Sequence, residues 1–346
     1  MSPRWRLTEN AELQSRNTFG VAASARWLVE VGDSAALGEV LALSQLQGPA
    51  PLVLGGGSNL LFAGDPESAV ISLDTRRIDI IENHADDAIV RVDAGVEWHA
   101  LVLWTLEQGL MGLENLALIP GTAGAAPIQN IGAYGTEVGE FVRTVETFDR
   151  GTGEVAQLDR DACAFAYRDS LFKHVPDRHI VTAVEFALPR QRALKLDYAG
   201  IPEELLAMGV EAPTFRDVAN AVIRIRRRKL PDPAVIGNAG SFFKNPIVPA
   251  ALAKELQRQH DGLPMFRGDD ADNRKVSAAW MIEHCGWKGF REGDAGVAAS
   301  HALVLVNHGS ATGAQLLSLA RRIAASVRQR FDVDLQPEPR IIGAQW

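Results

Sequence analysis

The sequence is poor in the residues that build disulfide frameworks and metal sites. Its two cysteines, Cys163 and Cys285, lie far apart and have no metal-ligand spacing around them. Its 8 histidines are scattered, without a His-Glu-x-x-His pattern. We therefore expect no metal site and no disulfide framework, and a reducing, cytoplasmic setting is the default expectation.

Long apolar runs and a surplus of basic residues are also missing. No run approaches the ~20 apolar residues of a membrane-spanning helix. The first residues carry Arg4, Arg6 and Glu9 in place of the apolar core of a secretion signal. The net charge of −8 argues against a general nucleic-acid surface but allows a local basic pocket for phosphates. We expect small-molecule partners, no nucleic acid, no membrane, and a monomer.

One feature that is present is a glycine-rich loop after a predicted strand. Gly55, Gly56 and Gly57 are followed by Ser58 and Asn59. The loop lacks the dinucleotide fingerprint, whose sixth position would be a glycine, and no Gly-Lys-Ser/Thr follows as in a Walker loop. A tight turn at a strand end and a pyrophosphate-binding loop of backbone N–H groups are about equally good interpretations of this stretch alone.

A second such loop covers residues 119–135. It is rich in glycine and alanine, has almost no charge, and carries the amides of Gln129 and Asn130. Glycine permits positive φ, and exposed N–H groups bind anions. A long packed turn is the structural alternative. Two such loops in one chain suit a ligand with both a pyrophosphate and a wide ring, such as a flavin dinucleotide.

Three polar motifs are candidates for chemistry. Arg168, in 167–170, could clamp a carboxylate or form a surface ion pair with Asp169. Ser241, in 240–246, could donate a proton, act as a nucleophile or cap a helix; without a Gly-x-Ser-x-Gly elbow, acyl transfer is disfavoured. Glu338, between two prolines, could be an acid or a solvated tail residue.

Periodicity, capping signals and turn residues predict an alternation of helices and strands. The basic cluster 224–229 closes one helix, where it complements the dipole or meets a phosphate. The Pro/Gly-rich stretch 231–240 is typical of a domain boundary, and 335–342 is expected to be extended. Helices are predicted over 36–45, 97–108, 214–229, 249–259, 276–285 and 312–331, and strands over 51–54, 69–73, 78–82, 88–93, 144–149, 154–158, 180–188 and 302–306.

Taken together, these motifs closely resemble those of the UDP-N-acetylenolpyruvoylglucosamine reductase family, over nearly the whole chain. The motifs are Asn17–Gly20, Gly55–Asn59, Ile119–Gly135, Tyr167–Ser170, Arg228–Pro233, Gly240–Pro246 and Pro337–Arg340, in this order. The resemblance implies an α+β flavoprotein with a two-part FAD-binding region of the PCMH type, similar to vanillyl-alcohol oxidase, and a C-terminal α/β substrate-binding domain. The implied domains are 1–74 and 75–230 for FAD, with 332–346 returning to the second, and 231–331 for substrate.

The resemblance also implies the cofactor and the reaction. FAD would be bound non-covalently and reduced by NADPH. The reduced flavin would then transfer hydride to C3 of the enolpyruvyl group of the nucleotide sugar, while C2 receives a proton. The implied FAD-binding residues are Gly55, Gly56, Gly57, Ser58, Asn59, Pro120, Gly121, Thr122, Gly124, Ile128, Gln129, Asn130, Gly132, Ala133 and Arg340.

The remaining implied roles fall on the polar motifs. Arg168 and Glu338 would hold and polarise the substrate carboxylate, and Ser241 would donate the proton, assisted by the charge of Lys229. Phosphate contacts would fall to Lys229, Asn245 and Lys288, and Tyr198 would belong to a loop that closes over the nucleotide. That loop has Tyr-Ala-Gly where the family usually has Tyr-Gly-Asp, and Pro339 replaces a common aliphatic residue.

Two rival functions remain. An oxidase of the same FAD-binding group would pass electrons to oxygen; many such oxidases attach FAD through a His or Cys near the first loop, which 55–59 lacks. A non-catalytic flavin- or nucleotide-sugar-binding protein would bind without turnover.

Overall fold

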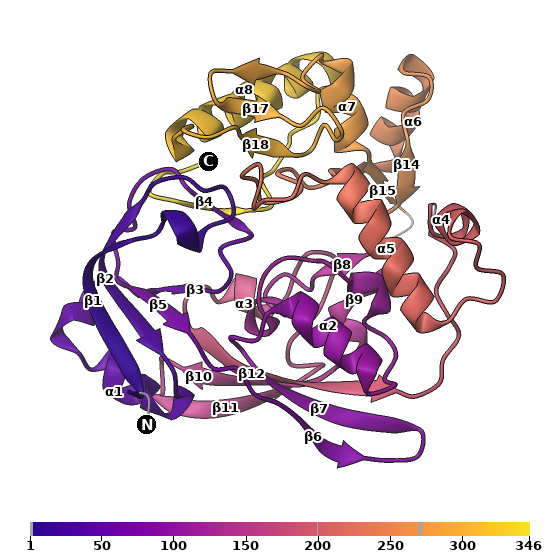
Figure 1. Cartoon of the computed structure of the whole chain (residues 1–346). Coiled ribbons are helices and arrows are strands. Elements are labelled where there is room, and N and C mark those ends of the chain that lie inside the picture. The colour runs from indigo at the N-terminus through magenta and orange to yellow at the C-terminus, as the bar shows by residue number, and fades with distance from the viewer. Residues whose placement is uncertain (1–2, 199, 269–271) are drawn as a thin grey trace. The chain divides into compact units, whose positions relative to one another are not determined.

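The computed structural model describes residues 3–198, 200–268 and 272–346 (Figure 1). The chain forms two compact units. Unit 1 comprises the stretch up to Ala11 together with Ala25–Gly56 and Glu67–Arg227. Unit 2 comprises Glu12–Ser24, Gly57–Pro66 and Arg228–Trp346. The first glycine-rich loop is therefore a point where the chain passes from one unit to the other.

Unit 1 contains a small sheet with the strand order β1-β2-β5-β3. The strands are β1 (Trp5–Glu12), β2 (Ser24–Val31), β3 (Leu52–Leu54) and β5 (Val70–Leu73), and β5 runs parallel to both β2 and β3. Helix α1 (Leu37–Leu41) adds Leu37 and Val40 to a core that includes Val29, Val31 and Ile71. The chain leaves this sheet at the end of β3. Gly55, the next residue, is exposed there.

The larger sheet of unit 1 has five strands in the order β11-β10-β12-β7-β6, and its neighbouring strands are antiparallel. Its strands are β6 (Ile78–Asn83), β7 (Asp87–Asp93), β10 (Val142–Asp149), β11 (Glu154–Asp159) and β12 (His179–Pro189). Helices α2 (Trp98–Glu107) and α5 (Phe215–Lys229) share one core with this sheet, in which the Trp98 and Phe186 rings lie 6.0 Å apart. Shorter elements are α3 (Leu171–His174), α4 (Ile201–Ala207), β8 (Gly132–Ala133) and β9 (Thr136–Glu137).

Helix α5 begins where the sequence predicts. The Thr214 N–H donates to the Asp217 carboxylate (2.9 Å), and the Asp217 N–H donates to the Thr214 hydroxyl (3.3 Å). This reciprocal pair satisfies N–H groups that the first helical turn leaves open. Val218, Ala221, Val222 and Ile225 form its buried face.

In its described residues, unit 2 combines three small sheets with three α-helices. β4 (Leu60–Phe62) pairs in parallel with β19 (Arg340–Ile342), and the other sheets have the orders β13-β15-β14 and β16-β17-β18. Their strands are β13 (Ile247–Pro249), β14 (Met265–Arg267), β15 (Asn273–Val276), β16 (Arg291–Glu292), β17 (Ala295–Val297) and β18 (Leu305–Asn307); the helices are α6 (Ala250–Gln259), α7 (Ala278–His284) and α8 (Gly313–Phe331).

The structure confirms the predicted helices within a few residues at their ends, and nearly all the predicted strands. Two expectations differ. The strand predicted at 302–306 starts at Leu305, because the preceding residues turn and the Val304 N–H donates to the His301 carbonyl. The C-terminal segment was expected to return to 75–230, but its strand β19 hydrogen-bonds to β4 at residues 60–62. Among the described residues, no helix is long and apolar enough to cross a membrane.

Candidate functional site

The two glycine-rich loops contact each other within unit 1. A Cβ on Gly55 would lie 2.8 Å from the Thr122 hydroxyl oxygen, and a Cβ on Gly56 would lie 2.9 Å from the Gly121 Cα. Neither position has room for a side chain, yet both glycines are exposed. Two loops that lie far apart in the sequence thus form one bare backbone surface.

Gly57 has a different reason to be glycine. Its φ is +61°, and a Cβ there would lie 2.0 Å from the Arg16 carbonyl oxygen. The Thr18 N–H donates to the Gly57 carbonyl (3.0 Å). Both contacts lie within unit 2, so Gly57 is required for the packing of the loop on 16–18 whatever else it binds.

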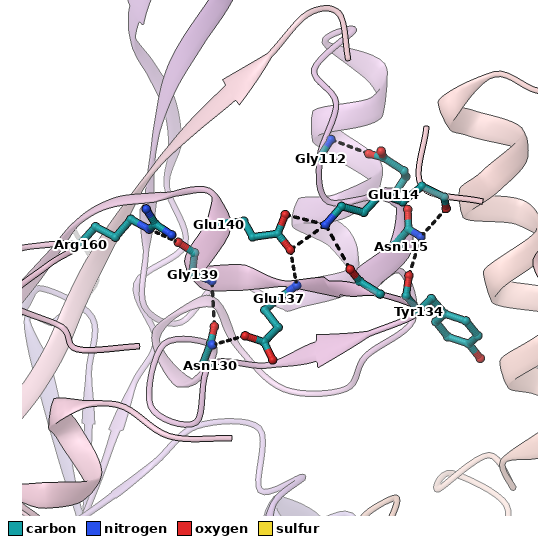
Figure 2. Close-up of polar contacts among 11 residues, drawn as sticks. Gly112, Glu114, Asn115, Asn130, Tyr134, Glu137, Gly139, Glu140 and Arg160 are labelled. Atoms are coloured by element: carbon teal, nitrogen blue, oxygen red, sulfur yellow. Dashed lines mark hydrogen bonds and ion pairs between the residues drawn. The ribbon is translucent and has the colours of Figure 1, made fainter. Parts of the chain in front are cut away.

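The second loop is held in shape by Asn130, which is 1% exposed and has a positive φ of 46°. Its amide nitrogen donates to the Glu137 carboxylate (2.8 Å), and its oxygen accepts from the Gly139 N–H (2.9 Å) (Figure 2). The amide nitrogen also donates to the Ala166 carbonyl (3.0 Å). The amide is therefore engaged by the protein itself and shapes the loop. Direct contact of Asn130 with a cofactor stays a prediction.

Arg168 is fixed on the same loop. Its guanidinium donates to the Gly132 carbonyl (2.8 Å), and the Ser170 hydroxyl donates to the Ile128 carbonyl (2.6 Å). Arg168 adopts a left-handed φ of 53°, which is uncommon for a non-glycine residue and typical of functional sites. Asp169, the ion-pair partner considered from the sequence, contacts the His174 ring instead (2.7 Å).

Arg226 is a second guanidinium here, which the sequence identified only as a member of the basic cluster 224–229. Its Nε donates to the Leu118 carbonyl at the start of the loop (3.2 Å). Burial lowers its pKa, the positive charge of Arg168 lowers it further, and Tyr134 raises it. Two neighbouring cations favour an anionic ligand. The helical period of α5 is the sequence signal that points to Arg226. This residue follows the buried Ile225 and lies one turn after the buried Val222.

The same loop start is held by a histidine. The Leu118 N–H donates to Nδ1 of His99 (3.0 Å). The pKa of His99 is lowered, chiefly by burial and also by Arg226 and Arg227, although Glu97 opposes the shift. A neutral ring keeps Nδ1 available as an acceptor, so His99 supports the backbone that also binds Arg226.

Tyr198 lies beside the loop as well. Its side chain is 49% exposed, and its ring centroid is 5.2 Å from that of Tyr134 at an interplanar angle of 69°. Unit 1 therefore brings together Arg168, Tyr198 and the second loop, three features that the sequence places far apart.

In unit 2, Ser241 lies on an extended segment that is paired on both sides. The Phe242 N–H donates to the Leu303 carbonyl (2.7 Å), and Ser241 forms a β-bridge with Val304. On the other side, the Glu338 N–H donates to the Phe242 carbonyl (2.8 Å). No described helix begins at Ser241, so the helix-cap interpretation is wrong.

Glu338 is held in the same arrangement. The Asn59 amide donates to the Glu338 carbonyl (3.5 Å), and the Arg340 N–H donates to the Asn59 carbonyl (3.0 Å). Glu338 is half-buried, so the solvated-tail interpretation is wrong too. Unit 2 thereby places Ser241, Glu338, Asn59 and Arg340 on neighbouring backbone segments.

The predicted phosphate ligands are also in unit 2. Lys229 and Lys288 both lower the pKa of His301, after the larger effect of its burial, and Glu283 opposes them. Lys288 itself contacts Glu283 (2.9 Å). The side-chain oxygen of Asn245 accepts a hydrogen bond from the Ala278 N–H at the start of α7 (3.0 Å). The NH₂ group of Asn245 is then left for another partner. The two lysines thus concentrate positive charge around a neutral histidine.

The fold and these loops define the class first: an FAD-binding flavoprotein. Residues 25–159 match the model of the FAD binding domain, and the exposed, side-chain-free surface at Gly55 and Gly56 fits a cofactor that is approached by backbone. Residues 232–342 match the C-terminal domain model of UDP-N-acetylenolpyruvoylglucosamine reductase. These matches confirm the predicted α+β class, with an FAD-binding region and a C-terminal substrate-binding domain.

The particular family follows from full-length relatives. The chain is 60% identical over 342 residues to a UDP-N-acetylenolpyruvoylglucosamine reductase of Xanthomonas euvesicatoria, covering 99% of this chain and 98% of the relative. It is 58% identical over 343 residues to one of Xanthomonas campestris, with the same coverage. A crystal structure of the reductase from Thermus caldophilus matches with a TM-score of 0.67 at 27% identity, covering 98% of this chain and 99% of that one. The chain belongs to the UDP-N-acetylenolpyruvoylglucosamine reductase family.

Proposed function

We propose that the protein reduces UDP-N-acetylenolpyruvoylglucosamine to UDP-N-acetylmuramate through FAD, with NADPH as reductant, in peptidoglycan precursor synthesis. The observation that carries the proposal is the backbone pairing of the Ser241 segment with Glu338. It places a serine and a glutamate on adjacent segments, and these residue types suit proton delivery next to a substrate carboxylate. FAD, when bound, supplies the hydride chemistry: it accepts hydride from NADPH and passes it to C3 of the enolpyruvyl group.

The protein's own groups handle the proton and the charge. Ser241 donates its hydroxyl proton to C2, which gains electron density as C3 receives hydride. Arg168 binds the adjoining carboxylate and neutralises the charge that spreads into it, and Arg226 adds to the positive potential. Glu338, protonated or hydrogen-bonded, orients the same carboxylate without repelling it.

The remaining side chains bind the nucleotide sugar. Lys229 and Lys288 attract its diphosphate, and Asn245 contributes its free NH₂ group. Lys229 also favours the ionised form of Ser241 through its charge. Tyr198 packs on the nucleotide part of the substrate. We propose that 1–74 and 75–230 bind FAD, that 231–331 binds substrate, and that the monomer is active.

The test is an anaerobic assay with FAD-loaded protein. Consumption of NADPH should require the enolpyruvyl nucleotide sugar, and the product should gain two hydrogens by mass spectrometry. NADPH consumption that needs only oxygen would favour the oxidase, and binding of both ligands without product would favour the non-catalytic protein.

A further inference from the structure

Asn115 is a buried side chain that joins two segments on which the proposed function relies. It lies in the short 3₁₀ helix Glu114–Leu116 and is 1% exposed. Its amide nitrogen donates to the Tyr134 carbonyl (2.9 Å) in the second glycine-rich loop and to the Lys195 carbonyl (3.0 Å) in the segment that carries Tyr198 (Figure 2). One NH₂ group therefore links the loop to the tyrosine segment.

Lys195 forms a second link between the same segments. Its ammonium group donates to the Gly135 carbonyl (3.1 Å) and to both carboxylate oxygens of Glu140 (2.8 and 2.7 Å). Glu140 in turn accepts the Glu137 N–H (3.0 Å), as Figure 2 shows. One end of this ion pair is thus attached to the backbone of the second loop at Gly135, and the other to Glu137 in strand β9, just after that loop.

The chemistry of residue 115 suits this role. A primary amide offers two N–H donors without charge, so it can satisfy two carbonyls in a buried position; a carboxylate offers no donor when ionised. Tyr134 has a φ of +49° and Gly135 a φ of +78°, so the loop turns sharply where the two links attach. Fixing that turn also fixes the Tyr134 ring, on which Tyr198 packs.

We propose that Asn115 and Lys195 are positioning residues that hold Tyr198 against the second loop in the orientation that binds the nucleotide-sugar substrate. This inference rests on the proposed function. Neither residue touches the reacting atoms; each acts through the carbonyls of Tyr134, Gly135 or Lys195. Loss of either link leaves Tyr198 present but less ordered. Substrate binding must then order this side chain, which lowers the affinity for the substrate.

The variants are Asn115→Asp, which removes both donors at nearly constant shape, and Lys195→Met, which removes the ammonium group at a partly exposed position. The matched control is Arg143→Met, which breaks the exposed ion pair with Glu82 on the large sheet. We expect KM for the enolpyruvyl substrate to rise about tenfold in both variants, with kcat changed by less than about twofold, as for loss of one or two hydrogen bonds. The control should keep the wild-type KM.

Two further readouts separate positioning from general damage. Calorimetric titration of the FAD-loaded protein with UDP-N-acetylglucosamine should show a matching loss of affinity, while the affinity for FAD and the rate of flavin reduction by NADPH stay at wild-type values. In a Tyr198→Ala background, Lys195→Met should raise KM no further, because both substitutions remove the same interaction. Should Asn115→Asp fail to fold, Lys195→Met carries the test alone.

The outcomes are distinguishable. A wild-type KM in Lys195→Met, or effects of Lys195→Met and Tyr198→Ala that simply add, overturns the positioning role. A loss of FAD affinity equal to the loss of substrate affinity overturns it as well, since the links would then serve the cofactor loop alone. A wild-type protein that does not turn over the enolpyruvyl substrate refutes the proposed function instead.

Discussion

The backbone N–H of Glu338 donates a 2.8 Å hydrogen bond to the carbonyl of Phe242, the residue that follows Ser241. This bond brings the C-terminal Pro-Glu-Pro motif beside the motif of 240–246, although the two are far apart in the sequence. A serine hydroxyl is a weak acid, so its use as a proton donor depends on fixed surroundings. The backbone pairing on both sides of Ser241 provides that fixed position.

Ser241→Ala separates the two halves of the proposed reaction. Flavin reduction by NADPH should stay within about twofold of wild type, while reoxidation by the enolpyruvyl substrate should fall by about 100-fold or more, the usual contribution of a general acid. Stopped-flow absorbance measures both rates. Ser310→Ala, an exposed serine in unit 2, is the control. Equal loss in both halves would refute the proton-donor role.

Glu338→Gln tests the side chain of Glu338, whose backbone pairs with the segment that carries Ser241. An amide keeps the shape but cannot be protonated, so we expect reoxidation by substrate to slow by about tenfold or more and reduction by NADPH to be unaffected. Glu255→Gln, on the exposed surface of α6, should leave both rates unchanged. An unaltered Glu338→Gln variant would remove the side chain from the mechanism and leave only its backbone role.

Gly56→Ala tests the contact between the glycine-rich loops. Its Cβ would meet the Gly121 Cα at 2.9 Å, so the loops must separate. Overpacking of this kind costs about 1–3 kcal/mol, and FAD affinity should fall with it. In Gly38→Ala the new Cβ would lie 4.0 Å from the Phe148 ring, so this change in α1 should stabilise by up to about 1 kcal/mol through helix propensity. Urea unfolding and flavin fluorescence report the two effects, and equal behaviour of the variants would contradict the packing argument.

The lowered pKa of Asp149 determines how the stability of the protein should depend on pH. Hydrogen bonding to Arg178 is the main cause that lowers its pKa from 3.8 to about 2, and the Gly151 N–H contributes. Because the folded-state pKa lies below the unfolded one, the stabilisation is complete above pH ~4 and is lost as the pH falls toward 2. Asp149→Asn should therefore lower the Tm at pH 7 and at pH 5, and the difference should shrink progressively as the pH falls from about 4 through 2. Asp334→Asn, in an exposed ion pair with Arg328, should have little effect at any of these pH values.

The sequence predicted elements with a strong local signal and missed those without one. The capping pair of Thr214 and Asp217 and the apolar period of α5 gave that helix almost to the residue. Strand β1 was not predicted, because it is largely polar and half-exposed, and its pairing in the sheet decides its structure. Tertiary hydrogen bonding outweighs weak local preference in such segments.

The residues of the site also differ in whether the sequence alone could identify them. The glycine-rich loops, Arg168, Ser241 and Glu338 were recognised from residue types and from the family resemblance. His99 and Asn115 were missed, and Arg226 was recognised only as part of a basic cluster, because each acts through a carbonyl or N–H of a residue distant in sequence. Residue composition carries no information on such a partner. The role of Asn130 in shaping its loop was hidden for the same reason.

The central claim is that bound FAD passes electrons from NADPH to an enolpyruvyl nucleotide sugar. The most direct test is an anaerobic single turnover followed through the visible spectrum of the FAD-loaded protein. The account predicts that one equivalent of NADPH bleaches the flavin and that one equivalent of UDP-N-acetylenolpyruvoylglucosamine restores its colour with formation of UDP-N-acetylmuramate. Flavin that is bleached by NADPH but regains its colour only when oxygen is admitted would contradict it.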